Sequence, residues 1–118
     1  MFNFEKLDVW HKAIDFADLV CNCTRKFPNE ERLGLTNQMR RAAVSISSNI
    51  AEGTSRMSQS DFKRLVEIAT GSVFEVISQA FVGRRQGFLT EDNFAALYSS
   101  AEEMGRMLSG LRKSLSQK

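Results

Sequence analysis

Apolar residues recur at steps of three and four along most of this 118-residue chain. That spacing places them on one face of an α-helix. The first stripe ends at Phe27 and Pro28, because proline disfavours helical geometry in the residue before it. The pattern predicts a first helix over 6–27. Its apolar stripe consists of Leu7, Trp10, Ile14, Ala17 and Cys21.

Three further stripes follow, separated by short polar segments. They predict helices over 30–53, 59–86 and 91–115. Asn29 is expected to cap the second helix, Ser58 or Ser60 the third, and Thr90 the fourth, since these residue types accept hydrogen bonds from the first free amides of a helix. Gly53 and Gly87 are expected near helix ends.

The connections are short and no segment has the alternating pattern of a strand. Short connections make consecutive helices antiparallel neighbours. The sequence therefore predicts an all-α fold, an antiparallel up-down-up-down four-helix bundle that forms a single domain over 1–118.

Two lines of polar residues interrupt the apolar pattern of the second and third helices. On a helix Ser45, Asn49 and Glu52 fall within about 60° of one another, and the next helix carries a similar line. We expect the two lines to meet in a hydrogen-bonded seam, with Ala42, Ala43, Gly53 and Gly71 allowing close approach of the backbones. The predicted structural network is Ser45, Asn49, Glu52, Ser72, Glu75 and Gln79.

The alternative for this stretch is a metal-dependent enzyme that uses Glu52 and Glu75 as a carboxylate pair. Di-metal bundles also need a Glu-x-x-His motif on each of two helices, whereas the one histidine here is His11. We therefore favour the structural network, and expect no catalytic residue, no metal and no cofactor. The protein is expected not to be an enzyme.

The third helix carries more apolar surface than a single stripe. Phe74, Ile77 and Phe81 lie well round the helix from Val76 and Ala80. A second stripe of this kind indicates an oligomer interface. The alternative is that a broad core or the N-terminal MFNF segment covers it.

The net charge gives little indication of a binding partner, since 16 basic and 14 acidic residues sum to only +2. No segment is a basic tail, so a nucleic-acid surface must come from folding or assembly. The candidate phosphate contacts are Arg40, Arg41, Arg56, Lys63, Arg84 and Arg85. The alternative is that these side chains lie on solvated faces and in ion pairs. In an oligomer, weak contacts repeated by each subunit add together.

No apolar run approaches the roughly 20 residues of a membrane span, and the N-terminus lacks the order of a signal peptide. We expect a cytoplasmic protein. Cys21 and Cys23 are two residues apart on a predicted helix, so they point to different sides and are expected to stay as free thiols.

Three segments resemble the 23S rRNA intervening-sequence proteins, a family of small bacterial proteins. They read KLDVWHKAIDFA (6–17), FPNEERLGLTNQMRRAAVSISSNIAEGTSR (27–56) and GSVFEV (71–76). The resemblance implies a four-helix bundle that assembles as a homopentameric ring. The family usually has proline at the position of Ser47, where proline would kink the helix or remove a hydrogen bond.

The family's function is mostly unassigned. A similar protein is the accessory variability determinant of diversity-generating retroelements, a pentamer that associates with a reverse transcriptase and with nucleic acid, although that subgroup is more basic than this chain. The expected function is a non-enzymatic, ring-forming scaffold or binding module with RNA as its ligand class. The alternative is a protein-only scaffold, or an accessory subunit of a nucleic-acid enzyme such as a reverse transcriptase.

Overall fold

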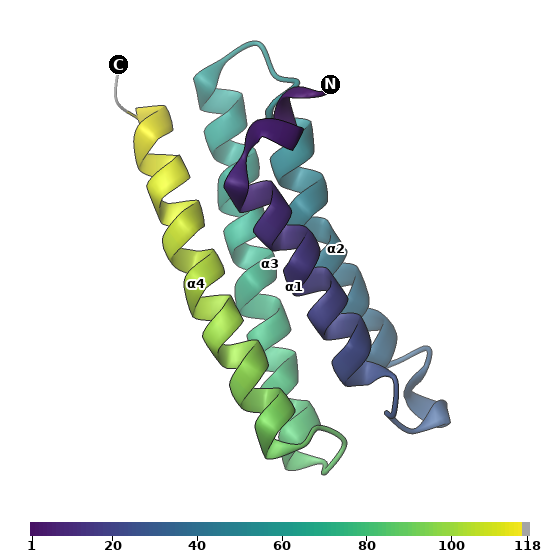
Figure 1. The fold of residues 1–118 in the computed structure, drawn as a ribbon. Helices are drawn as coiled ribbons and strands as arrows, with labels where there is room; N and C mark the ends of the chain where they lie inside the picture. Colours follow the sequence, from purple (N-terminus) through teal and green to yellow (C-terminus); the bar gives the residue numbers. More distant parts are fainter. Residues whose placement is uncertain (117–118) are drawn as a thin grey trace.

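The computed structural model describes residues 1–116, which form four α-helices in a single bundle (Figure 1). The helices are α1 (Asp8–Thr24), α2 (Leu35–Gly53), α3 (Gln59–Arg85) and α4 (Glu91–Ser116). Two short 3-10 turns, η1 (Asn3–Lys6) and η2 (Asn29–Glu31), precede α1 and α2. The described residues contain no strand. The all-α prediction is confirmed.

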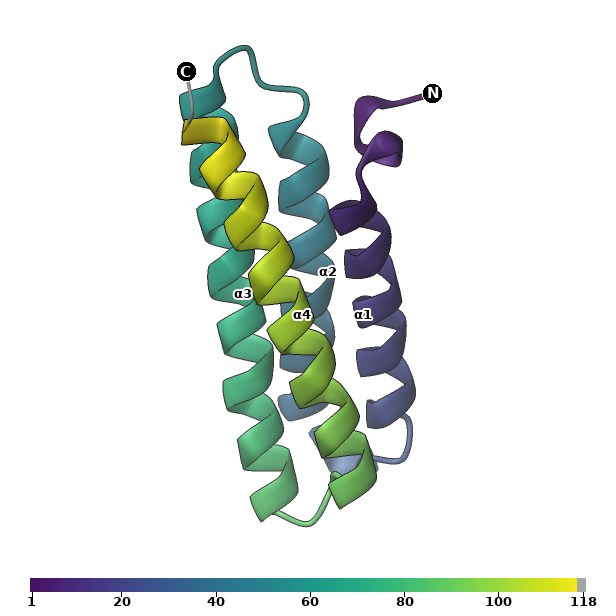
Figure 2. The same ribbon diagram turned by 60° about the vertical axis from the view of Figure 1, so that its left-hand side comes forward.

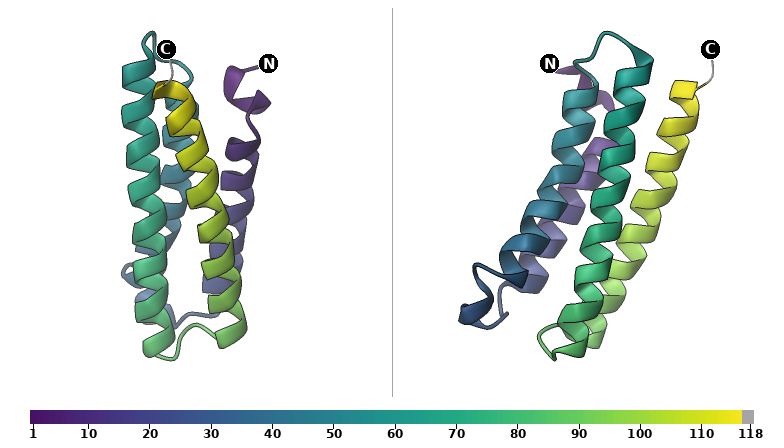
Figure 3. Two further views of the ribbon diagram at one scale, coloured as in Figure 1. Left: turned by 90° about the vertical axis from the view of Figure 1, so that its left-hand side faces the viewer. Right: turned by 180° about the vertical axis from the view of Figure 1, so that it is seen from behind.

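The helices alternate in direction, and each packs against two others in the order α1–α2, α2–α3, α3–α4 and α4–α1 (Figures 1 and 2). The α1–α2 side of the bundle therefore lies opposite the α3–α4 side. Seen from behind, α2 and α4 occupy opposite edges (Figure 3). The predicted up-down-up-down bundle is confirmed.

The core is built from the predicted stripes of α2, α3 and α4. The predicted stripe of the first helix is wrong, because α1 turns a neighbouring line of residues to the core: Ile14 is exposed and Leu7, Trp10, Ala17 and Cys21 are only partly buried. The buried line of α1 is Val9, Ala13, Phe16, Val20 and Cys23.

Small residues such as Ala13, Ala43 and Ala69 are fully buried between the helices. Their size brings the backbones close, and longer side chains fill the remaining space. The largest fully buried side chains include Met39, Ile46, Ile50, Leu97, Met104 and Leu108.

The helix ends follow the predicted cap residues in the second half of the chain. Ser58 Oγ accepts from the amide of Asp61 at 3.1 Å, and Thr90 Oγ1 accepts from the amide of Asn93 at 3.1 Å. Gly87 ends α3 with a φ of 79°. The amides of Gly87 and Phe88 return to carbonyls of the last turn, as in a Schellman motif.

The predicted first turn of the second helix is wrong. Asn29 begins the separate turn η2 instead of capping α2, which starts five residues later than predicted, at Leu35. Gly34 precedes α2 with non-helical angles and offers no side chain to cap it. The Glu31 carboxylate accepts from the Leu35 amide at 3.4 Å in its place. The first helix is also shorter than predicted, ending at Thr24 rather than 27.

Ser47, where the family usually has proline, lies inside α2 without interrupting it. Its side chain is buried, and its hydroxyl donates to the Val44 carbonyl at 3.0 Å. The helix is thus continuous through this position.

The expectation that no apolar segment approaches the length of a membrane span needs correction. Among residues 1–116, α3 is long and apolar enough, by length and composition alone, to cross a membrane. A core helix of a soluble bundle passes the same test. One side of α3, with Val66, Ala69 and Val73, is buried in the bundle core.

Candidate functional site

The polar lines of α2 and α3 meet at one point. Ser45 and Ser72 share a hydrogen bond between their hydroxyls at 3.0 Å. Asn49 Nδ2 donates to Ser45 Oγ at 3.0 Å and to the Ser45 carbonyl at 2.8 Å. Three of the six predicted network residues therefore form a continuous set of hydrogen bonds across the α2–α3 contact, which we call the seam.

The other three predicted members lie outside this set. Glu52 is exposed and forms an ion pair with Arg56, one turn along the chain. Glu75 is also exposed. The Gln79 Oε1 atom is buried and has no hydrogen-bond partner in the part of the chain that the structure describes. The prediction of a six-residue network is wrong for these residues, because Glu52 and Glu75 turn toward solvent and the buried Gln79 oxygen meets no donor among residues 1–116.

Glu52 and Glu75 do not form a carboxylate pair. Ser45 and Ser72 are level with each other, and the two helices are antiparallel. Glu52 lies seven residues above that level on α2, and Glu75 three residues below it on α3. At 1.5 Å per residue, the ten-residue offset separates them by about 15 Å along the bundle. The alternative of a metal site shared by these two carboxylates is not supported by this geometry.

Of the small residues near the seam, Gly53 is the one at which a larger side chain would clash with a neighbouring residue. A Cβ atom at Gly53 would lie 2.7 Å from Phe62 Cε1, far inside normal contact. Gly53 therefore makes room for the Phe62 ring at the end of the bundle. Gly71 is exposed, and a Cβ there would meet nothing within 4 Å. The expectation that Gly71 allows close approach within the bundle is wrong.

Three of the six candidate phosphate contacts are already engaged within the chain. Arg40 Nε donates to Thr24 Oγ1 at 2.9 Å, and its Nη2 donates to the Cys21 carbonyl at 3.4 Å. It thus satisfies groups at the C-terminal end of α1, where the helix dipole favours a cation. Arg56 pairs with Glu52.

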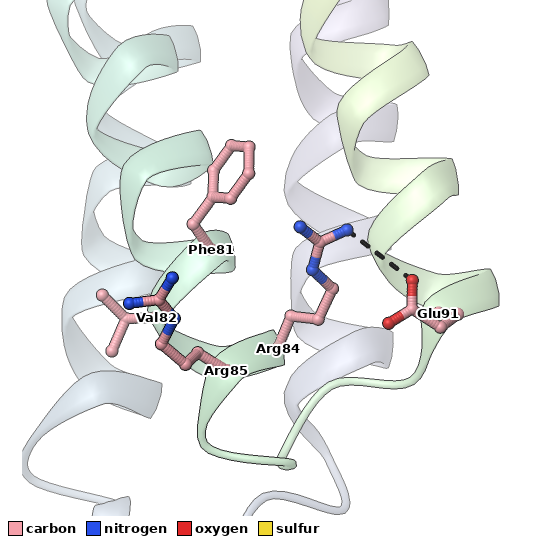
Figure 4. A pocket seen from close by; sticks show the side chains of 5 residues that line it. All are labelled: Phe81, Val82, Arg84, Arg85 and Glu91. Carbon is pink, nitrogen blue, oxygen red and sulfur yellow. Dashed lines mark ion pairs between the residues drawn. The ribbon is translucent and has the colours of Figure 1, made fainter.

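Arg84 is the third engaged arginine. Its guanidinium carbon lies 3.8 Å from the centre of the Phe94 ring, a cation–π contact. It also pairs with Glu91 at 3.6 Å. Figure 4 shows Arg84 reaching across to Glu91 at the start of α4, whereas Arg85 points the other way in that view.

The remaining candidates are Arg41, Lys63 and Arg85, which have no ion-pair partner among residues 1–116. They do not gather in one patch. Lys63 is in the second turn of α3 and Arg85 is its last residue, about 33 Å apart at 1.5 Å per residue. The single chain therefore offers separate cations rather than one basic surface.

The predicted interface residues lie on the outer side of α3 and α4, which we call the α3–α4 face. Phe74 is 72% exposed and Phe81 is 45% exposed. Ile77 is half-buried against the core. The N-terminal turn η1 packs on α1 and α2, so it does not cover this face.

Tyr98 is a member of this face that the sequence did not reveal. It is 42% exposed and packs beside Phe81 and Phe94, with ring centres 6.4 and 6.0 Å away. A shallow cavity of about 280 Å³ lies beside it, lined also by Phe74, Ile77 and Glu102. Tyr98 lies outside the apolar stripe of α4. A search of the sequence for aromatic residues outside each helix's apolar stripe would therefore have found it.

A second, larger cavity of about 540 Å³ continues this face toward the α3–α4 turn. Figure 4 shows its lining residues, Phe81, Val82, Arg84, Arg85 and Glu91. It combines an aromatic ring with one free and one paired guanidinium, groups that suit stacking and contact with an anion.

The groups with possible chemical reactivity are placed apart from these surfaces. Burial raises the pKa of the Cys23 thiol, so it stays protonated at neutral pH. Cys21 and Cys23 are both free thiols. The exposed His11 ring bonds to the Glu5 carbonyl at 2.7 Å. Residues 1–116 contain no group of three or more His, Cys, Asp or Glu placed to hold a metal ion.

Comparison with known proteins agrees with the fold. A search of curated proteins found no match. The structure is similar to the crystal structure of a protein of unknown function from the S23 ribosomal protein family of Bacteroides thetaiotaomicron VPI-5482. The TM-score is 0.81 and the identity 24%, covering 89% of this chain and 95% of the other. The family model for the 23S rRNA-intervening sequence protein matches residues 5–110, and the chain therefore belongs to that family.

Proposed function

We propose that this protein is a non-enzymatic binding module that works as an assembly of identical chains, with the α3–α4 face as the contact between copies. The exposure of Phe74, at the centre of an apolar face, is the observation that carries the proposal. A contiguous apolar patch of this kind usually marks an interaction site. Ring closure into a homopentamer, as the family resemblance suggests, is the form of assembly we expect.

The mass of the protein in solution tests this proposal. Multi-angle light scattering should give a multiple of the 13.3 kDa chain mass for the wild type and a lower mass for Phe74→Ser. Ile68→Ser is the matched control, since Ile68 is also an exposed apolar residue of α3 but lies about 120° round the helix from Phe74. A wild-type monomer at tens of micromolar would overturn the proposal.

We propose RNA binding as the second function, on the basis of the cations Arg41, Lys63 and Arg85, which have no ion-pair partner among the described residues. In one chain these cations are far apart. An assembly repeats them around its surface, so that several phosphates are bound at once. We expect the protein to be located in the cytoplasm.

Fluorescence anisotropy with a labelled structured RNA, repeated from low to physiological salt, tests the second function. Binding should weaken steeply as salt rises, because several phosphates are neutralised together. The double variant Arg41→Gln/Arg85→Gln should reduce this slope of affinity against salt. The control is Arg106→Gln, which removes an exposed cation of α4 and should leave the slope unchanged. Absence of binding at low salt would favour the protein-only scaffold or an accessory subunit of a nucleic-acid enzyme.

A further inference from the structure

A polar cavity of about 370 Å³ lies at the α2–α3 contact, on the side of the seam toward the start of α2. Its volume is within the range of sites for small molecules, about 300–1,000 Å³. Ala42 is its one apolar lining residue, so the cavity suits a small polar ligand rather than an apolar segment of another chain. The polar lining residues are Asn37, Gln38, Arg41 and Ser45 of α2 and Glu75 of α3.

Arg41 and Glu75 bring opposite charges to two walls of this cavity. Arg41 is four residues from Ser45 on α2. Glu75 is three residues from Ser72 on α3, and it lies on the same side of the Ser45–Ser72 hydrogen bond as Arg41, because the two helices are antiparallel. The two charged residues therefore differ in height by about 1.5 Å along the bundle. Both are exposed, and neither has an ion-pair partner among residues 1–116.

Gln79 adds a buried acceptor to the same part of the α2–α3 contact. It lies about 20° round α3 from Ser72, so it faces α2 as Ser72 does. Gln79 is seven residues from Ser72, as Gln38 is from Ser45, so Gln38 and Gln79 are level across the contact. The Gln79 Oε1 atom has no hydrogen-bond partner within the described chain. Helix α3 thus offers acceptors at this level, whereas α2 offers the donors of Arg41.

We propose that this cavity binds a small dipolar molecule, an α-amino acid, whose carboxylate pairs with Arg41 and whose ammonium group pairs with Glu75. The planar guanidinium matches the two oxygens of a carboxylate, and the ammonium group donates hydrogen bonds that the Glu75 carboxylate accepts. Inside the cavity, a ligand with negative charge alone would be repelled by Glu75, and one with positive charge alone by Arg41. The amides of Asn37 and Gln38 both donate and accept, so they suit a polar side chain on the amino acid.

The site does not depend on self-association. All of its residues belong to one chain, and they lie at the α2–α3 contact rather than on the α3–α4 face. A monomeric wild type would therefore remove the proposed assembly and leave this site as it is.

Nuclear magnetic resonance of the isotope-labelled protein with the common L-amino acids tests the proposal. Each amino acid is added at about 10 mM, which saturates a site with a Kd of about 1 mM. At least one of them should shift the side-chain amide signals of Asn37, Gln38 and Gln79. Arg41→Gln and Glu75→Gln should each weaken its binding by about tenfold or more, because each removes a hydrogen bond between charged groups.

Matched controls use both the protein and the ligand. Arg106→Gln and Asp15→Asn remove exposed charges from α4 and α1, and both variants should bind as the wild type does. The N-acetyl derivative of the amino acid lacks the ammonium group and its amide lacks the carboxylate, so each should bind to the wild type about tenfold or more weakly. These two compounds test both contacts without changing the protein.

Three results would overturn the proposal. The first is that no amino acid moves the three amide signals. The second is that either derivative binds as tightly as the amino acid itself, and the third is that a folded Arg41→Gln or Glu75→Gln variant keeps the wild-type Kd. Circular dichroism of the variants shows whether they fold.

Discussion

Helix α3 takes part in two very different surfaces. Toward α2, at the seam, its Ser72 hydroxyl has a partner and Phe62 fills the space that Gly53 leaves. Toward the outside, on the α3–α4 face, Phe74 and Tyr98 remain exposed. The hydrogen bonds of the first surface are made within one chain, and we propose that the second surface is covered by another copy. Residues of the seam should therefore control the stability of the chain, and residues of the face should control what the chain binds.

The largest expected effect is in the core behind the seam. Ile50 is fully buried, so Ile50→Ala should lower the free energy of unfolding by about 2–5 kcal/mol, through lost burial and the cavity left behind. Phe74→Ala should change it by less than about 0.5 kcal/mol in dilute protein. Urea denaturation at low concentration measures both. A large loss for Phe74→Ala would mean that the face is part of the fold.

Arg40 and Arg41 are adjacent in sequence but have different roles. Arg40 bonds within the chain, as the seam residues do, whereas Arg41 has no ion-pair partner among residues 1–116. Arg40→Ala should cost about 1.5–3 kcal/mol, because hydrogen bonds from a charged donor to Thr24 and Cys21 are lost. Arg41→Ala should cost less than about 0.5 kcal/mol. Thermal melts of the two variants side by side give the comparison. Equal losses would contradict the assignment of Arg40 to the fold alone.

The Ser45–Ser72 hydrogen bond should contribute a smaller amount. Ser45→Ala should lower stability by about 0.5–1.5 kcal/mol. In a double-mutant cycle with Ser72→Ala, the two losses should not add, because either change removes the same bond. Strictly additive losses would show that the hydroxyls act independently and that the seam is held by packing.

The smallest effect compares two glycines. Gly71→Ala should raise the free energy of unfolding by up to about 1 kcal/mol, since alanine favours a helix and the new Cβ meets nothing. Gly53→Ala should gain nothing, because its Cβ would displace Phe62. Chemical denaturation of both variants is the measurement. Stabilisation by Gly53→Ala would show that the Phe62 ring moves freely.

The sequence predicted the helices well because their apolar stripes are long and regular. It missed the start of α2, where the Glu31 carboxylate and Gly34 decide the boundary through local contacts rather than through periodicity. It placed Arg40 among ligand contacts because a cation that bonds to the end of another helix has no signature in its own helix. Glu52 and Glu75 lie on the same helix faces as the seam residues, so the sequence placed them in the network, but both are exposed. Periodicity gives the face of a helix, and packing against the next helix decides which side chains of that face are buried.

An even number of antiparallel helices has one further consequence. The N-terminus and the C-terminal end of α4 both lie at the end of the bundle away from the α3–α4 turn (Figure 1). A fluorophore, a fused protein or a surface tether attached at either terminus therefore leaves the turn, with Arg85 and the larger cavity beside it, pointing outward. Immobilised chains would present that end to a passing molecule, all in one orientation.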